Sequence, residues 1–119
     1  MRMRENVIWM DGNKVDYFYM RSREKLVEIL SKYLKRKSLI LDIGAGYCHY
    51  SQYLSEHGFH VVALDINKTR LRTNSFKGLK VVADAARMPF PDNSFDSAIC
   101  IEVIEHLERE NYKIPFIII

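Results

Sequence analysis

The sequence has few of the residues that build disulfide-bonded, metal-binding or membrane-embedded proteins. Its 119 residues include two cysteines, Cys48 and Cys100, so neither a disulfide framework nor a cysteine-rich metal site is expected. No apolar run approaches the roughly 20 residues of a membrane-spanning helix, and no secretory signal pattern appears. Repeats and low-complexity stretches are also absent. These absences predict one cytoplasmic globular domain with no metal ion and no membrane contact.

Positive charge is concentrated in the first third of the chain. Residues 1–38 contain ten Lys and Arg against five Asp and Glu, whereas residues 39–119 contain eight against ten. A basic region is one mark of an RNA-binding protein. Here, however, the basic residues are scattered along a predicted helix that begins at Ser22. A solvated helix surface is therefore the favoured interpretation of this region.

Four short apolar runs predict buried parallel strands, at residues 38–43, 59–65, 79–84 and 95–101. The first three close on an aspartate, namely Asp42, Asp65 and Asp84. In open parallel sheets, ligands bind at the carboxyl ends of the strands. We therefore expect three carboxylates along one rim of the sheet.

A glycine loop follows the first of these strands and predicts a nucleotide-type cofactor site. Gly44 and Gly46 let the backbone turn sharply and approach a ligand closely. A helix is expected from about Tyr47, with its free N–H groups directed at the loop. Asp65 lies 21 residues after Gly44. That spacing matches the roughly 20 residues at which an acidic side chain reaches ribose hydroxyls in βαβ units.

Two other nucleotide-binding patterns fit less well. The dinucleotide fingerprint has a third glycine three residues after the second, where this chain has His49. Such sites also have no need of Asp42 before the loop or Asp84 after the third strand. A P-loop is excluded, because no Gly-Lys-Ser/Thr follows the glycines.

Four ordered motifs resemble those of class I S-adenosylmethionine-dependent methyltransferases, in the branch that includes ubiquinone/menaquinone-biosynthesis and tRNA wobble-uridine enzymes. The first motif is similar to residues 41–46, and the second to the strand that ends at Asp65. The third and fourth resemble residues 83–96 and 101–107. The resemblance covers roughly residues 38–108. It implies an α/β fold: a Rossmann-like, doubly wound, mostly parallel sheet of order 3-2-1-4 with helices on both faces.

The resemblance also implies S-adenosylmethionine as the cofactor and a set of contacts to it. Gly44 and Gly46 would approach the methionine part, with Asp42 near its amino group, and Asp65 would accept hydrogen bonds from the ribose hydroxyls. Asp84, Ala85 and Ile66 would surround the adenine, with Met88 and Phe90 as a further wall. Cys100, Ile101 and Glu102 would lie near the sulfonium. The implied cofactor-binding residues are Asp42, Gly44, Ala45, Gly46, Asp65, Ile66, Asp84, Ala85, Cys100 and Ile101.

The implied reaction is methyl transfer, for which the sequence identifies neither a catalytic base nor an acceptor. A positioned nucleophile needs a base only if it must lose a proton. Glu102, Tyr50 and His106 remain open as candidates. No Asn/Asp-Pro-Pro-aromatic segment, typical of amino-directed nucleic-acid methyltransferases, follows the fourth strand. A small-molecule acceptor is therefore favoured, with RNA as the second option.

The family pattern stops near Leu107, before the further strands that full-length members contain. We expect a C-terminally truncated domain whose tail, 116–119, forms a short fifth strand after a crossover over residues 102–113. An exposed edge of the fourth strand would favour a homodimer or a completing partner. The alternative function is a catalytically incomplete S-adenosylmethionine-binding fragment, or a subunit that needs a partner.

The chain is expected to form one domain with two parts. Residues 1–37 would supply an N-terminal flap and a helix, and residues 38–119 the cofactor-binding core. Within the flap, residues 7–10 and 15–19 would form either a hairpin or an irregular cover over the cofactor.

Overall fold

The computed structural model describes residues 7–9, 23–100 and 116–118. Its centre is a parallel sheet of four strands: β2 (Leu39–Ile43), β3 (His60–Asp65), β4 (Leu79–Val82) and β5 (Ser97–Cys100). They lie side by side in the order β5-β2-β3-β4. If the four parallel strands β2, β3, β4 and β5 are numbered 1 to 4 along the chain, the order read from β4 to β5 is the predicted 3-2-1-4. The Rossmann-like α/β fold is therefore confirmed, and each strand lies within one of the four predicted runs.

Two further strands extend the sheet beyond β5. Strand β6 (Phe116–Ile118) pairs antiparallel with β5, and β1 (Val7–Trp9) pairs antiparallel with β6. The tail thus forms the fifth strand as predicted, but the expected crossover is wrong, because a crossover would make β6 parallel to β5. The predicted free edge of the fourth strand is also wrong, because β5 is paired on both sides, with β2 and β6. The pairing with β6 occupies that edge of β5, and the homodimer or completing partner stays a prediction.

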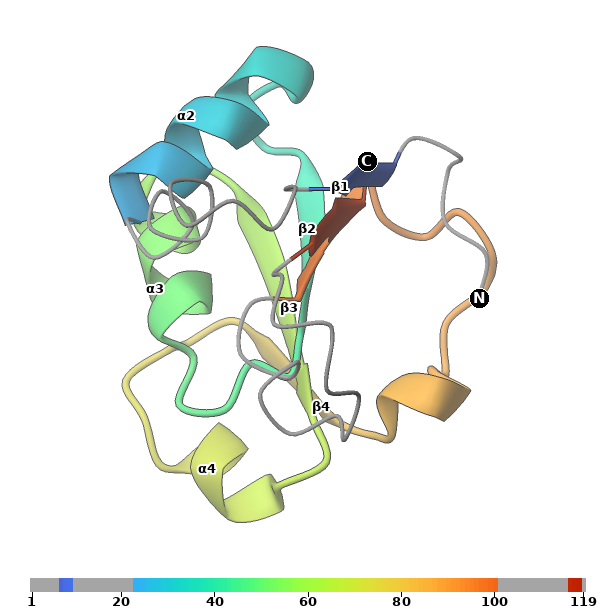
Figure 1. Cartoon of the computed structure of the whole chain (residues 1–119). Helices are drawn as coiled ribbons and strands as arrows, with labels where there is room; N and C mark the ends of the chain where they lie inside the picture. The colour runs from blue at the N-terminus through green and yellow to red at the C-terminus, as the bar shows by residue number, and fades with distance from the viewer. Residues whose placement is uncertain (1–6, 10–22, 101–115, 119) are drawn as a thin grey trace.

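The described helices cover one face of the sheet. Helices α2 (Arg23–Tyr33), α3 (His49–Glu56) and α4 (Lys68–Arg72) lie on the same side in Figure 1. Leu26 and Leu30 of α2, Leu54 of α3 and Leu71 of α4 are buried in one cluster with Ile40 of β2. The alternation of side chains along each strand assigns this cluster to one face.

The second face of the sheet carries its own apolar cluster. Leu41 and Ile43 of β2 and Leu64 of β3 are buried there with Phe95. The described cover is the segment after the 3-10 turn η1 (Ala85–Arg87), from which Phe90 packs edge-on against Phe95 at 4.9 Å between ring centroids. The helix expected at residues 102–107 lies outside the described residues.

The N-terminal predictions are tested only in part. Helix α2 begins at Arg23, the first described residue after the gap, and packs on the sheet as expected. Of the predicted hairpin, residues 15–19 lie outside the described residues, and β1 pairs with β6. The division of the domain at residues 37 and 38 stays a prediction.

Candidate functional site

The carboxyl ends of β2, β3 and β4 meet along one rim of the sheet. Leu41 pairs with Val62 and Ile43 with Leu64 in parallel register, and Leu64 in turn pairs with Val81. Because the strands run the same way, the loops that follow Ile43, Asp65 and Val82 all leave the sheet at this rim. The predicted cofactor residues after the first three strands are therefore neighbours in space, as ligand sites of such sheets require.

The glycine loop crosses this rim from β2 to α3. Gly44 and Gly46 have φ angles of 69° and 56°, a left-handed conformation that glycine adopts without steric cost. Between them, the Ala45 N–H donates to the Leu64 carbonyl at 2.9 Å, which fixes the loop on β3. Helix α3 then begins at His49, two residues later than predicted. The loop is held by backbone hydrogen bonds and leaves its outer surface without a Cβ at two positions.

Asp65 joins the glycine loop to the turn before α4. Its Oδ2 accepts a hydrogen bond from the Gly46 N–H at 2.7 Å, and its Oδ1 accepts one from the Asn67 N–H, also at 2.7 Å. A carboxylate has about four lone-pair sites, so each oxygen retains one for a further donor. Asp65 is half-buried at the rim, and Ile66 beside it is 70% exposed. This arrangement fits a ligand with two adjacent hydroxyl groups, such as a ribose.

Asp84 and Ala85 lie exposed where β4 leads into the 3-10 turn. Asp84 Oδ1 accepts a hydrogen bond from the Ala86 N–H at 2.9 Å, so the carboxylate caps this turn. Met88 and Phe90 pack against the apolar cluster on the second face of the sheet. Their contact with an adenine stays a prediction, as do the roles of Asp84 and Ala85.

Asp42 lies buried beneath α3, with 4% of its surface exposed. Its Oδ2 accepts a hydrogen bond of 2.6 Å from the Ser51 hydroxyl of α3. It shares this side of β2 with Ile40, because residues two apart in a strand point the same way. The structure thus links Asp42 to the helix that follows the glycine loop, a relationship that spacing alone did not reveal. Its predicted place near the cofactor's amino group is not tested.

The residues expected near the sulfonium are described only in part. Cys100 ends β5 and is buried among the apolar side chains of the second face. Ile101, Glu102 and His106 lie outside the described residues. Tyr50 packs against the cluster beneath α2 and α3, so this candidate base lies in the helical layer.

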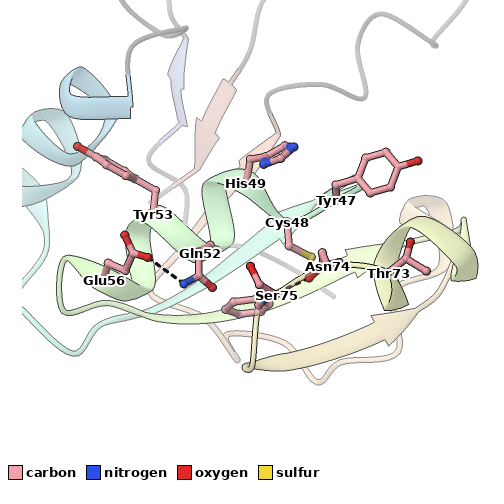
Figure 2. Close-up of a pocket in the computed structure, with 10 residues that line it drawn as sticks. Tyr47, Cys48, His49, Gln52, Tyr53, Glu56, Thr73, Asn74 and Ser75 are labelled. Atoms are coloured by element: carbon pink, nitrogen blue, oxygen red, sulfur yellow. Dashed lines mark hydrogen bonds between the residues drawn. The ribbon is translucent and has the colours of Figure 1, made fainter.

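A hollow of about 330 Å³ opens beside the rim, between α3 and the connection from α4 to β4. Figure 2 shows Tyr47 and Thr73 at one end of it and Glu56 at the other, where Gln52 donates to Glu56. The sequence analysis missed this hollow. The polar run Thr73-Asn74-Ser75 between two predicted elements was its one signal, and such a run is equally typical of a simple loop. The lining residues are Tyr47, Cys48, His49, Gln52, Tyr53, Glu56, Thr73, Asn74, Ser75 and Phe76.

Cys48 lines this hollow, and its thiol is expected to react slowly as a nucleophile. Burial, and next the negative charge of Asp42, raise the pKa of its thiol to about 11, although the Lys80 ammonium opposes the shift. The reactive thiolate is therefore scarce near neutral pH. Its backbone is left-handed, with φ 63° and ψ 30°, an uncommon conformation for a residue with a Cβ. Within residues 7–9, 23–100 and 116–118, no group of His, Cys, Asp and Glu side chains could hold a metal ion.

Comparison with known proteins adds what the geometry leaves open. The family described as "Methyltransferase domain" matches residues 41–114, which include the end of β2, the glycine loop and the whole of β3, β4 and β5. This chain belongs to that family. Family membership and fold together support S-adenosylmethionine as the cofactor. They do not determine which class of molecule accepts the methyl group. Among the described residues of this methyltransferase domain, no helix is long and apolar enough to cross a membrane.

Three proteins show how far the likeness extends. An uncharacterised protein of Methanocaldococcus jannaschii is 34% identical over 85 residues, which cover 71% of this chain and 37% of that protein. The tRNA (carboxymethyluridine(34)-5-O)-methyltransferase of Schizosaccharomyces pombe is 28% identical over 105 residues, 86% of this chain and 45% of that enzyme. A crystal structure of a candidate methyltransferase from an antibiotic biosynthesis pathway of Anabaena variabilis superposes with a TM-score of 0.64 at 25% identity, over 76% of this chain and 38% of that one. The chain thus spans less than half the length of each.

Proposed function

We propose that this chain binds S-adenosylmethionine at the rim formed by β2, β3 and β4, and that the whole protein transfers the cofactor's methyl group to an acceptor. One observation carries the proposal. The Asp65 carboxylate accepts the Gly46 N–H at 2.7 Å, so the acidic residue and the glycine loop, 19 positions apart in sequence, form one site. Family membership supports the same activity.

Different residues of the rim would contact different parts of the cofactor. Asp65 has one lone pair left on each oxygen to accept the two ribose hydroxyls. The glycine loop lets the methionine part approach the backbone, and Asp84, Ala85 and the exposed Ile66 provide the adenine side. When bound, S-adenosylmethionine supplies a methyl group that is already activated by a positively charged sulfur. The protein's part is therefore to position the acceptor in line, and proximity alone lowers the barrier substantially.

Two classes of acceptor remain in the proposal. The sequence favours a small molecule, because the aromatic segment of amino-directed nucleic-acid methyltransferases is missing. RNA is the second candidate, since one relative with 28% identity is a tRNA methyltransferase. Because the chain covers 45% of that enzyme, binding without turnover by the isolated chain is the outcome expected if it is an incomplete fragment or a subunit.

Calorimetric titration of S-adenosylmethionine into the purified chain tests the cofactor. We expect saturable binding to the wild type and at least a tenfold loss of affinity in Asp65→Ala, because charge-assisted hydrogen bonds contribute about 1.5–3 kcal/mol each. Glu56→Gln is the matched control: it also removes one carboxylate charge, but on α3 outside the rim. Its affinity should equal that of the wild type.

Three results would contradict the proposal. They are binding of NAD as strong as that of S-adenosylmethionine, full affinity in a folded Asp65→Ala variant, and no binding by a folded wild-type chain. Circular dichroism of each variant confirms folding before the titration, since Asp65→Ala also removes a hydrogen bond of the glycine loop.

A further inference from the structure

Positive charge accumulates without any acidic residue along α4 and the segment that leads into β4. Between Ile66 and Ala83 the chain contains five basic residues and no Asp or Glu. Within the part of the chain that the structure describes, none of the five forms an ion pair, and all but Lys80 are exposed. The five are Lys68, Arg70, Arg72, Lys77 and Lys80. We call this surface, together with Tyr47, the α4 face.

An aromatic side chain stands among these cations. Tyr47 is 50% exposed, and the Arg70 guanidinium lies over its ring at 5.9 Å from the centroid. His49 lies 6.4 Å from the same ring, between centroids. A half-exposed aromatic ring beside an arginine offers the stacking surface on which proteins hold an unpaired base.

The hollow beside Tyr47 continues the α4 face inward. Its volume, about 330 Å³, is at the lower end of the range for pockets that hold a small organic group. Thr73 and Asn74 lie on the Tyr47 side of the hollow, and Ser75 lies closer to Gln52 (Figure 2). The Thr73 hydroxyl and the Asn74 amide nitrogen donate within their own segment, which leaves their oxygens as acceptors, and the Ser75 hydroxyl adds a polar group. Its one carboxylate, Glu56, lies at the opposite end. A ligand with a negatively charged backbone, such as a nucleic acid, would therefore meet cations on the α4 face and polar hydrogen-bonding groups inside the hollow.

The α4 face also adjoins the cofactor rim. Tyr47 directly follows Gly46, and α4 is capped by Asn67, whose side chain accepts the Arg70 N–H at 3.1 Å. The N–H of Asn67 is in turn bound by Asp65. A ligand on this face thus lies beside the residues proposed to hold the ribose.

We propose that the α4 face binds single-stranded RNA, with phosphates on the basic side chains and one base stacked on Tyr47. Cations that form no ion pair within the described residues attract phosphate, the exposed ring accepts a base, and the polar hollow can bond a 2′-hydroxyl, the group that distinguishes RNA from DNA. A flat anionic membrane would engage the charges but not the hollow. The claim that RNA binds to this face does not depend on the proposed function. The further claim that the bound RNA is the methyl acceptor rests on the proposed function.

Fluorescence anisotropy of a short labelled single-stranded RNA, measured over a salt series, tests the charge component. The double variant Arg72→Ala/Lys77→Ala is compared with Lys32→Ala/Lys35→Ala. The second variant removes the same charge from the last turn of α2 and the segment just after it, and α2 and α4 lie at opposite ends of the helical layer in Figure 1. We expect the slope of log affinity against log salt to become shallower by about 0.7 for each phosphate that the first variant no longer neutralises. The second variant should keep the wild-type slope.

A tyrosine pair tests the stacking component. Tyr47→Ala should weaken RNA binding about 5- to 150-fold with an unchanged salt slope, because stacking is not ionic. Tyr33→Ala removes a tyrosine of similar exposure, 59%, from α2 and should have no effect. Single-stranded DNA of the same sequence should bind more weakly than RNA.

Calorimetry with S-adenosylmethionine on the same samples separates the two proposals. Weaker RNA binding with intact cofactor binding in Arg72→Ala/Lys77→Ala is the expected result. The RNA proposal is overturned by undetectable RNA binding at low salt, by equal losses in the two double variants, or by equal binding of DNA. Binding to anionic lipid vesicles that matches RNA binding and is abolished in the same variant also overturns it.

Discussion

Ser51 in α3 donates a hydrogen bond of 2.6 Å to the Asp42 carboxylate at the end of β2, and both residues are buried. This interaction links the strand before the glycine loop directly to the helix after it. A buried carboxylate must be hydrogen-bonded, because its desolvation is costly. The pair therefore holds the two ends of the loop at a fixed distance.

Ser51→Ala should lower the free energy of unfolding by about 1–3 kcal/mol, because it removes a buried donor from an anion that stays buried. Urea denaturation measures the change. Ser55→Ala, at an exposed position of the same helix, is the control and should leave the midpoint nearly unchanged. Equal midpoints for the two variants would show that Asp42 does not depend on Ser51.

Ser97→Ala should have the opposite effect. Ser97 begins β5 and is fully buried, and its hydroxyl has no hydrogen-bond partner in the described part of the chain. Removing an unsatisfied hydroxyl while keeping most of the side chain's volume is expected to be neutral or to stabilise by up to about 1 kcal/mol. The same urea experiment checks this, and a destabilisation as large as that of Ser51→Ala would indicate a hidden partner.

Cys48 occupies a backbone conformation that glycine adopts more easily, with φ at 63°. Cys48→Gly should therefore be more stable than Cys48→Ala by about 1 kcal/mol, because a Cβ in the left-handed region costs about that much. Both variants lack the buried thiol, so the comparison isolates the backbone. The pair Ser55→Gly and Ser55→Ala, inside α3, should show the reverse order, since glycine weakens a helix by about 1 kcal/mol relative to alanine. The same order at both positions would contradict the strain at Cys48.

The Cys48 thiol should make stability fall at alkaline pH. Burial raises its pKa from 9.0 to about 11, so between these values the unfolded chain has lost the proton that the folded chain retains. The contribution is fully present below pH 9 and is lost as the pH rises through about 11. Urea denaturation from pH 8 to 11 should show a decline of roughly 2 kcal/mol in the wild type beyond that in Cys48→Ala, which corrects for other groups. Parallel curves for the two proteins would exclude the effect.

The sequence by itself determined the parallel sheet and the rim at which the carboxyl ends of its strands meet. Apolar runs that end in Asp42, Asp65 and Asp84, joined by helical segments, specify strands whose crossovers are right-handed. Their carboxyl ends then meet at one edge whatever the details of packing. The positions of Gly44, Gly46 and Asp65 follow from this local pattern, and the hydrogen bond between Gly46 and Asp65 agrees with it.

Only the tertiary structure decided the features that depend on partners distant in sequence. The apolar tail is compatible with either strand direction, and pairing with β5 and β1 made β6 antiparallel. Asp42 carries the same charge as Asp65, yet the alternation of β2 turns it toward Ser51 and buries it. The hollow exists because α3 and the Thr73–Phe76 connection pack side by side, and its lining residues share no sequence pattern. The basic run of the α4 face is visible in the sequence, but only packing brings Tyr47 beside Arg70. Local pattern specifies elements and their order, whereas side-chain neighbours arise only when those elements pack.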